Sequence, residues 1–359
     1  MNRQYPRLIV HETRLRHNVE EVTARCGELG IHVCGVVKGV HALPSPTRIV
    51  RDGGTNGIGT SRLEQIVRCR ENGIEGPYWL IRTPAMTEVP DVVALCDVSL
   101  QSDLRTLEAL EQECARRNTT HSVVIMADLG DLREGFWDKD ELVDVCAAVE
   151  QRMPHLHLLG IGVNLCCYGS VRPTAEKMDE LVALAQRVEV RIGRPLEVIS
   201  GGATFSFPLV HNHTMPKGIN HLRIGELFLC GLSPDWSTEV SYLHRDVFTL
   251  QAEVIEVREK PSYPQGELCT DAFGRQRHYE DLGTRHRALL ALGRADVGEL
   301  ESLIPRTEGI TVVGGSSDHC ILDVTDHPLK VGDIVEFDLL YSHLLYLTSR
   351  EDVTITYEE

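Results

Sequence analysis

The sequence lacks long apolar runs and regularly spaced cysteines. No stretch approaches the roughly 18 apolar residues of a membrane-spanning helix, and the N-terminal segment lacks the apolar core of a secretion signal. The 11 cysteines are scattered, and their only close pair, Cys166 and Cys167, is adjacent rather than spaced like metal ligands. We therefore predict a cytoplasmic protein with reduced thiols, no disulfide framework, no bound metal and no membrane partner.

Positive charge is also scarce. Lys and Arg together number 36 against 53 Asp and Glu, which gives a formal net charge of −17. This charge would repel a polyanion, and no stripe of basic residues offsets it, so nucleic acid is excluded as a partner. The hydrophobic fraction of 42% over 359 residues is enough for a barrel and a smaller second domain.

Short apolar segments alternate with helical patterns through the first two thirds of the chain. Runs such as VVIMADLG and LLGIGVNL are typical of strands buried on both faces. We expect strands at residues 32–38, 57–60, 78–82, 98–101, 122–128, 157–164, 196–200 and 221–224. Helical patterns lie between them at 62–73, 103–117, 139–152 and 175–193. The alternation predicts an α/β fold with a parallel (β/α)₈ TIM barrel, and a doubly wound open sheet is the alternative.

The pattern changes between residues 232 and 247. Beyond this segment the long helices give way to alternating strands with turn residues, as in FTLQAEVIEVREKP and DIVEFDLLY. We predict a barrel domain over residues 1–235 and a mainly β domain over residues 236–359. The pattern leaves open whether the first strand of the chain packs with the C-terminal domain.

Lys38 lies where a barrel carries its catalytic groups. It follows the apolar run VCGVV at the carboxyl end of the first predicted barrel strand. Burial lowers the pKa of an ammonium group, and a neutral lysine amine can form an imine with a carbonyl cofactor. A lysine at a strand end is more often a plain surface charge, so Lys38 alone does not decide the chemistry.

Glycine-rich turns follow the last two predicted barrel strands. One, SGGAT, ends at Thr204, and the other, RIGE, ends at Glu226. Backbone N–H groups in such turns approach an anion closely, and the hydroxyl of Thr204 or Ser206 can add a donor. TIM barrels commonly build phosphate sites at this place. Together with Lys38, the two turns indicate a phosphorylated cofactor across the barrel mouth.

A set of motifs runs along nearly the whole chain. They are GVVKG around Lys38, MADLGDLREGF at 126–136, GIGVNLCCYG at 160–169, ISGG at 199–202, LRIGE at 222–226, GGSSDH at 314–319 and GDIVEFDLLY at 332–341. Together they resemble the alanine-racemase family of pyridoxal-phosphate enzymes, fold type III. The pair DLGDLREG and GIGVNLCCYG is the most specific part of the resemblance. Within the family, the motifs match those of ornithine racemases more fully than those of alanine racemases.

The resemblance implies a bound pyridoxal 5'-phosphate and assigns its contacts. Lys38 carries the cofactor as a Schiff base and transfers one proton. Arg133 contacts the phenolic oxygen, and Tyr341 lies near the phosphate and Lys38. Asn164 stands where alanine racemases have a histidine that stacks on the cofactor. The phosphate is bound by the Thr204 hydroxyl and the amides of Gly225 and Glu226.

Arg223 is the residue that the resemblance places at the pyridine nitrogen. An arginine is effectively never deprotonated, so it keeps that nitrogen unprotonated and makes the ring a weaker electron sink. A short-lived carbanion at Cα then favours rapid reprotonation over side reactions. Decarboxylases of the same fold type have a glutamate at this place. Arg223 therefore favours racemisation over decarboxylation, unless it is a structural arginine in a barrel-end salt bridge.

Racemisation needs a second proton-transfer group on the opposite face of Cα. Alanine racemases use a tyrosine donated by the partner subunit, but the corresponding segment here, ALGRAD, carries Arg294. A guanidinium cannot act as a base. The resemblance places the GGSSDH loop in the active site of the partner subunit, so we expect the second base at Asp318 or His319, in a homodimer with shared active sites. Further candidates are Tyr279, Asp271 and Tyr341.

The resemblance implies that the substrate is ornithine or another basic amino acid. Met126 stands where some alanine racemases have a carbamylated lysine, and the tyrosine shortly after the Schiff-base lysine is missing, which weakens an assignment to alanine. The distal ammonium of a diamino acid needs an anionic or carbonyl contact, which Asp128, Asp131, Glu134 or Asp271 could supply. We expect an acidic pocket near Asp131 or Asp271.

Several other functions stay open at this point. A racemase of alanine or of broad specificity would share these motifs. A fold-type-III lyase is a second alternative. It could be a decarboxylase, or a metal-dependent aldolase or dehydratase that uses the His and Asp of GGSSDH, although one His and one Asp are fewer ligands than a metal site usually has. A non-enzymatic pyridoxal-phosphate carrier would resemble the barrel alone. An unrelated barrel could bind some other phosphorylated ligand.

Overall fold

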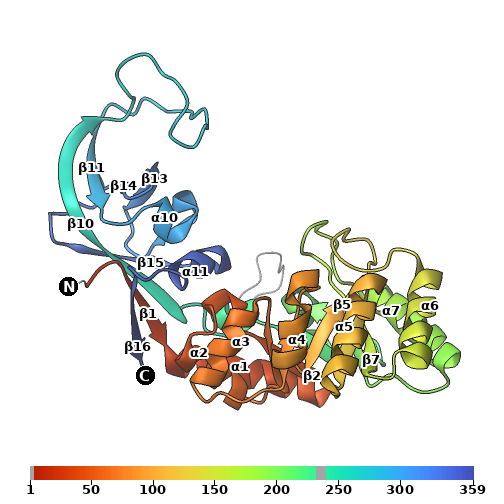
Figure 1. The fold of residues 1–359 in the computed structure, drawn as a ribbon. Helices are drawn as coiled ribbons and strands as arrows, with labels where there is room; N and C mark the ends of the chain where they lie inside the picture. Colours follow the sequence, from red (N-terminus) through yellow and green to blue (C-terminus); the bar gives the residue numbers. More distant parts are fainter. Residues whose placement is uncertain (1–3, 232–239) are drawn as a thin grey trace. The chain divides into compact units, whose positions relative to one another are not determined.

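The computed structural model describes residues 4–231 and 240–359. The chain separates into two compact units, one made of residues 14–244 and one made of residues 1–13 with 245–359 (Figure 1). The domain boundary predicted between residues 235 and 236 lies outside the described residues. Each unit has its own sheet and its own hydrophobic core.

The first unit contains a closed barrel of parallel strands. In chain order they are β2 (His32–Val36), β3 (Gly57–Thr60), β4 (Tyr78–Leu80), β5 (Val98–Gln101), β6 (His121–Ala127), β7 (Leu156–Val163), β8 (Val198–Ala203) and β9 (His221–Ile224). Each strand pairs with its neighbour in sequence, and β9 pairs with β2, which closes the barrel. The predicted (β/α)₈ barrel is confirmed, and the open-sheet alternative is wrong.

Apolar side chains fill the interior of the barrel. The cluster contains Trp79, Leu100, Val124 and Met126, together with Cys34 and Val98. Six of the seven residues of β6 are buried, and so are the last four of β7. Burial on both faces explains why these two strands read as near-continuous apolar runs rather than alternating ones. The filled interior leaves the ends of the barrel as the places where a ligand can bind.

Helices connect the strands and cover the outside of the barrel (Figure 1). They are α1 (Glu12–Glu28), α2 (Pro44–Asp52), α3 (Leu63–Glu71), α4 (Val89–Leu95), α5 (Leu104–Arg117), α6 (Lys139–Arg152), α7 (Ala175–Ile192), α8 (Phe207–His211) and α9 (Glu226–Cys230). Polar caps fix several of their starts: Asp103 accepts from the Thr106 amide at 3.1 Å before α5, and Thr174 accepts from the Lys177 amide at 3.3 Å before α7. Gly193, with φ +80°, ends α7.

The second unit is built on an antiparallel sheet. Its strands are β1 (Arg7–His11), β10 (Phe248–Pro261), β11 (Thr284–Leu290), β12 (Ile304–Pro305), β13 (Thr311–Gly315), β14 (Cys320–Asp323), β15 (Ile334–Asp338) and β16 (Thr354–Glu358). The strand β1 pairs with β10 and with β16, so the first strand of the chain belongs to this sheet. Two short helices, α10 (Arg294–Val297) and α11 (Tyr341–Leu347), complete the unit. No helix within the described ranges is long and apolar enough to cross a membrane.

Two buried histidines form part of the barrel wall. His121 bonds to Ser99 at 2.8 Å, and His221 bonds to Ser200 at 2.9 Å and stacks on Trp79 with ring centroids 4.6 Å apart. Burial lowers the pKa of His121 to about 4 and, with the charge of Arg223, lowers the pKa of His221 to about 3. Both imidazoles are therefore neutral in the folded protein near neutral pH.

This burial predicts loss of stability in mild acid. Below the unfolded pKa of about 6.5, the unfolded chain binds protons at His121 and His221 that the folded protein does not bind. The free energy of unfolding should therefore fall as the pH falls from 6.5, with each histidine contributing a slope of about 1.4 kcal/mol per pH unit. Denaturant titrations between pH 7 and pH 4 measure this slope. His121→Gln should reduce it, whereas His157→Gln, at an exposed position on β7, should not; an unchanged slope in the first variant would contradict the prediction.

Candidate active site

Lys38 lies just past the carboxyl end of β2 and begins a short 3₁₀ turn. Burial is the main reason that the pKa of Lys38 lies below its ordinary value, and the positive charge of Arg133 lowers it further. The charges of Cys167 and Glu134 act in the opposite direction. A lysine with a lowered pKa presents a larger fraction of neutral amine, which is the form that attacks a carbonyl or accepts a proton.

Arg223 lies on β9, is only 3% exposed and makes hydrogen bonds to the ends of two neighbouring strands. One of its nitrogens, Nη2, donates to the Val163 carbonyl at 2.8 Å and to Oδ1 of Asn164 at 2.5 Å, and Nη1 donates to the Ser200 hydroxyl. All three acceptors are uncharged. Burial lowers the pKa of Arg223, but a guanidinium stays protonated, so a positive charge is fixed at the mouth.

A polar chain leads from Arg223 to a second arginine. The amide nitrogen of Asn164 donates to Oε1 of Glu134, and Nη2 of Arg133 donates to the same carboxylate oxygen at 2.6 Å. Arg133 and Glu134 lie in the loop after β6, and Asn164 is the first residue after β7. Three of the predicted cofactor residues, Arg133, Asn164 and Arg223, are thus joined through Glu134. The sequence singled out Glu134 only as a possible contact for a distal ammonium, and its place between Asn164 and Arg133 was not expected.

The two glycine-rich segments meet as predicted at the ends of β8 and β9. Thr204 begins a 3₁₀ turn, and its hydroxyl accepts from the Leu227 amide at 3.4 Å. A Cβ on Gly225 would lie 2.6 Å from the Val36 carbonyl oxygen, so only glycine allows this turn to approach β2. The structure differs in one detail: Gly201 and Gly202 belong to β8 itself, which runs to Ala203. Backbone amides and the Thr204 hydroxyl in these two turns are the kind of donors that suit an anion.

The side chain of Glu226 has an unexpected position. The sequence singled out only its amide, but the carboxyl group lies in the electrostatic field of Lys38. Burial raises the pKa of Glu226 to about 7, and Lys38 lowers it. This carboxyl group can therefore hold a proton near neutral pH beside the lysine.

Asp131 organises the loop that follows β7. It is 1% exposed, and its carboxylate accepts from the amides of Cys167 at 3.1 Å, Tyr168 at 2.9 Å and Val171 at 3.3 Å. The Gly169 amide also donates to the backbone carbonyl of Asp131 at 2.9 Å. A carboxylate with these partners holds a loop, so the expected acidic pocket for a distal ammonium does not form at Asp131.

The second residue expected in that pocket, Asp271, is engaged in the same way. Its Oδ1 accepts from the amides of Phe273 and Arg275, each at 2.9 Å, and its Oδ2 lies 3.4 Å from Arg277. Asp271 shapes a turn in the segment between β10 and β11. In the structure, both carboxylates therefore accept hydrogen bonds that hold their own loops in place.

The predicted second bases lie in the other unit. Asp318 and His319 are exposed in the hairpin between β13 and β14, and Tyr341 is the first residue of α11. The amide of Arg294 donates to the Ser316 carbonyl at 3.0 Å, so the start of α10 is hydrogen-bonded to this hairpin. Arg294 is 7% exposed and forms an ion pair with Glu301. The guanidinium of Arg294 is thus engaged in an ion pair inside the β unit.

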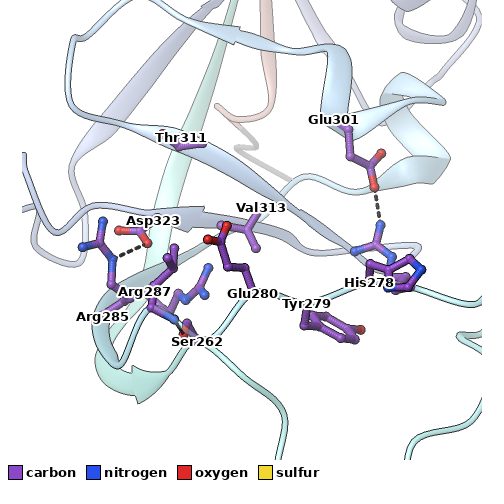
Figure 2. A pocket seen from close by; sticks show the side chains of 12 residues that line it. Ser262, His278, Tyr279, Glu280, Arg285, Arg287, Glu301, Thr311, Val313 and Asp323 are labelled. Atoms are coloured by element: carbon purple, nitrogen blue, oxygen red, sulfur yellow. Dashed lines mark hydrogen bonds and ion pairs between the residues drawn. The ribbon is translucent and has the colours of Figure 1, made fainter.

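A cavity of about 490 Å³ lies in the β unit, on the sheet beside the segment that joins β10 and β11 (Figure 2). Arg285 pairs with Asp323 at 2.9 Å across one side of it, and Arg277 pairs with Glu301 on another. Tyr279, one of the further candidate bases, lines this cavity. Across residues 4–231 and 240–359 there is no group of three or more His, Cys, Asp and Glu side chains placed to hold a metal ion.

Replacing Asp131 tests its role in the loop. Asp131→Ala leaves several partly buried amides without an acceptor, which predicts a loss of about 2 kcal/mol in the free energy of unfolding. It also predicts faster hydrogen exchange at Cys167, Tyr168 and Val171 in particular. Denaturant unfolding and exchange by NMR or mass spectrometry measure both effects. Asp144→Ala, at an exposed position on α6, is the control and should change neither; unchanged exchange in Asp131→Ala would show that the loop is held by other contacts.

Comparisons with known proteins agree with the geometry. The N-terminal domain of alanine racemase matches residues 10–234 of the chain. An ornithine racemase from Acetoanaerobium sticklandii is 35% identical over 343 residues, which cover 95% of this chain and 96% of that protein. A lysine racemase from Thermotoga maritima is 35% identical over 355 residues, which cover 99% of each chain.

A solved structure shows the same fold. The crystal structure of an alanine racemase from a D-cycloserine-producing Streptomyces lavendulae gives a TM-score of 0.74 at 18% identity, covering 98% of this chain and 97% of that one. The resemblance read from the motifs is therefore confirmed, and the chain belongs to the alanine racemase family.

Proposed function

We propose that this chain is a pyridoxal-phosphate-dependent racemase that interconverts the L and D enantiomers of ornithine or another basic amino acid. The observation that carries the proposal is the buried Arg223, held by uncharged acceptors at the same barrel mouth as Lys38. The names of the ornithine and lysine racemases, which the chain matches over nearly its whole length, support the substrate class.

The residues present at the mouth suit pyridoxal phosphate. The turns at Thr204 and Gly225 offer a hydroxyl and backbone amides for a phosphate, and Lys38 offers a partly neutral amine for the aldehyde. The proposed contacts are Lys38 with the aldehyde carbon, Arg133 with the phenolic oxygen, Arg223 with the ring nitrogen, Asn164 beside the ring, and Thr204, Gly225, Glu226 and Tyr341 toward the phosphate. When bound, the cofactor withdraws electrons from Cα and so makes its C–H bond acidic.

Arg223 and Lys38 then divide the work. A guanidinium can only donate hydrogen bonds, so Arg223 supplies no proton to the ring nitrogen and limits the charge drawn away from Cα. A carbanion that is stabilised less is reprotonated sooner, which favours racemisation over loss of other groups. Lys38, whose pKa is lowered by burial, accepts the Cα proton on its own side of the substrate.

A homodimer with shared active sites is part of the proposal. Asp318 and His319 are exposed in the hairpin between β13 and β14. A backbone hydrogen bond joins this hairpin to Arg294 at the start of α10. The family resemblance places this surface in the active site of the partner subunit. Asp318 and His319 are accordingly the partner-derived candidates for the second proton carrier.

Removing Lys38 tests the proposed attachment. The wild-type protein, mixed with pyridoxal phosphate and desalted, should retain the cofactor with the visible absorbance of a lysine adduct. It should also racemise L-ornithine and exchange its α-hydrogen in deuterium oxide. Lys38→Ala should lose the adduct and lower racemisation by at least about 10²-fold, since the amine is also a proton acceptor. Lys177→Ala, at a partly exposed position on α7, is the control. Stable adduct formation by Lys38→Ala, or release of carbon dioxide by the wild type, would contradict the proposal.

Changing the charge at Arg223 tests the choice of reaction. With Arg223→Glu, the ring nitrogen should be protonated, which strengthens electron withdrawal by the ring. Side reactions such as transamination or decarboxylation should then rise about tenfold or more relative to racemisation. A tenfold change in this ratio corresponds to a difference of about 1.4 kcal/mol between the two activation free energies. Arg223→Gln keeps a hydrogen-bond donor without the charge, and it provides a second test in case Arg223→Glu does not fold. Product analysis of ornithine, carbon dioxide and pyridoxamine phosphate measures the ratio. An unchanged ratio in both variants would show that Arg223 is only structural.

A further inference from the structure

The cavity in the β unit is lined by an arginine that has no partner. Arg287 lies on β11, and its Nη1 atom is shielded from solvent without a hydrogen-bond acceptor. Among the residues that the structure describes, no carboxylate forms an ion pair with Arg287. Buried polar groups are nearly always hydrogen-bonded. An unpaired guanidinium nitrogen in the wall of a cavity therefore indicates a place for an acceptor that comes from outside the chain.

The carboxylate nearest to Arg287 in the sheet is already engaged. The register of β11 and β14 places Asp323 directly opposite Arg287. However, Oδ2 of Asp323 accepts from Nε of Arg285 at 2.9 Å, and its Oδ1 accepts from the amide and the hydroxyl of Thr325 at 3.1 and 2.7 Å. Both oxygens of Asp323 thus hold Arg285 and the turn after β14, and the charge of Arg287 is left without a counterion.

The segment that joins β10 and β11, residues 262–283, supplies the other wall of the cavity and is tied to the sheet at several points. The Leu282 amide donates to the Ser262 hydroxyl at 2.6 Å, which brings the two ends of the segment together. Farther along, Arg277 forms an ion pair with Glu301. The chain itself therefore holds both walls of the cavity, which is the preformed arrangement that small-molecule sites usually have.

This second wall carries a carboxylate that is also unpaired. Glu280 lines the cavity, and its side chain makes no ion pair or hydrogen bond with any residue in 4–231 or 240–359. Figure 2 shows Glu280 of the connecting segment and Arg287 of β11 in the same cavity. Because the two opposite charges do not form an ion pair with each other, space remains between them. A carboxylate and a guanidinium separated in this way suit a ligand that carries both an ammonium and a carboxylate.

We propose that the cavity in the β unit binds a free α-amino acid, with Arg287 donating to its carboxylate and Glu280 accepting from its ammonium. An α-amino acid carries both groups on a short carbon frame, and a cavity of about 490 Å³ is within the range of small-molecule sites. All of the lining residues belong to the β unit, so this site is built without the barrel mouth. The inference goes beyond the proposed racemase function and does not depend on it.

Hydrogen exchange followed by mass spectrometry tests the proposal and shows where a ligand binds. The probes are L-ornithine and L-alanine, with putrescine as an amine that lacks a carboxylate and butyrate as an acid that lacks an ammonium. Added to the full chain loaded with pyridoxal phosphate, either amino acid should slow amide exchange in residues 277–283 and in β11, since the ligand joins these two walls. Putrescine and butyrate at the same concentration should not. Slower exchange in barrel peptides alone, or equal protection by butyrate, would overturn the proposal.

Variants that remove one charge at a time link this protection to the two residues. Arg287→Met keeps the aliphatic stem, and Glu280→Gln changes an exposed side chain with little risk to the fold. Each should weaken amino-acid binding by at least about tenfold in a titration of the same exchange effect. Arg306→Met is the matched control, because Arg306 lies in the β unit, bonds to Asp338 at 2.7 Å and does not line the cavity.

Two results would show that the cavity has another role. Wild-type affinity in both Arg287→Met and Glu280→Gln would contradict the assigned contacts. If no probe protects the wild type, and Arg287→Met changes the subunit association measured by sedimentation, the cavity is a contact between copies of the chain and the proposal is wrong. The exchange measurement needs no turnover, so a failure of the racemase function would be seen separately and would leave this result standing.

Discussion

A buried cation held by uncharged acceptors determines the arrangement of the barrel mouth. Burying a guanidinium costs several kcal/mol unless its N–H groups are hydrogen-bonded. Arg223 on β9 meets this need with the Ser200 hydroxyl of β8, the Val163 carbonyl and the Asn164 amide oxygen. One side chain thereby ties β9 to β8 and to the end of β7. Because the acceptors are neutral, its charge is not cancelled locally and acts on whatever binds above it.

The same constraint extends to the next loop through Asn164 and Glu134. A single carboxylate accepts hydrogen bonds from the Asn164 amide and the Arg133 guanidinium, so negative charge at the mouth is held between the two arginines. Lys38 is left in a setting where burial and the charge of Arg133 outweigh the carboxylate. The reactive amine is therefore a property of the whole network and not of the lysine alone.

Much of the fold was predictable because buried parallel strands have a simple sequence pattern. The strands β3, β5 and β9 begin and end at the residues expected from the sequence, whereas the place of β1 was left open and only its pairing with β10 and β16 decides it. The glycine turns were predictable because backbone approach to β2 at Gly225 excludes any side chain. Lys38, Arg133, Asn164 and Arg223 were brought to one place by the rule that carboxyl ends of barrel strands meet.

What the sequence could not supply was the direction in which each polar group points. Asp131 and Asp271 looked like ligands for an ammonium, but both carboxylates accept backbone amides. Hydrogen-bond partners distant in sequence, such as Glu134 and Asn164, leave no local periodicity to detect.

The bonds of Arg223 have a consequence for the shape of the barrel mouth when nothing is bound there. Since three hydrogen bonds to the chain itself already hold the guanidinium, it needs no ligand to stay in place. A barrel of this kind keeps its mouth in shape when empty, so little order has to be created when the ligand returns.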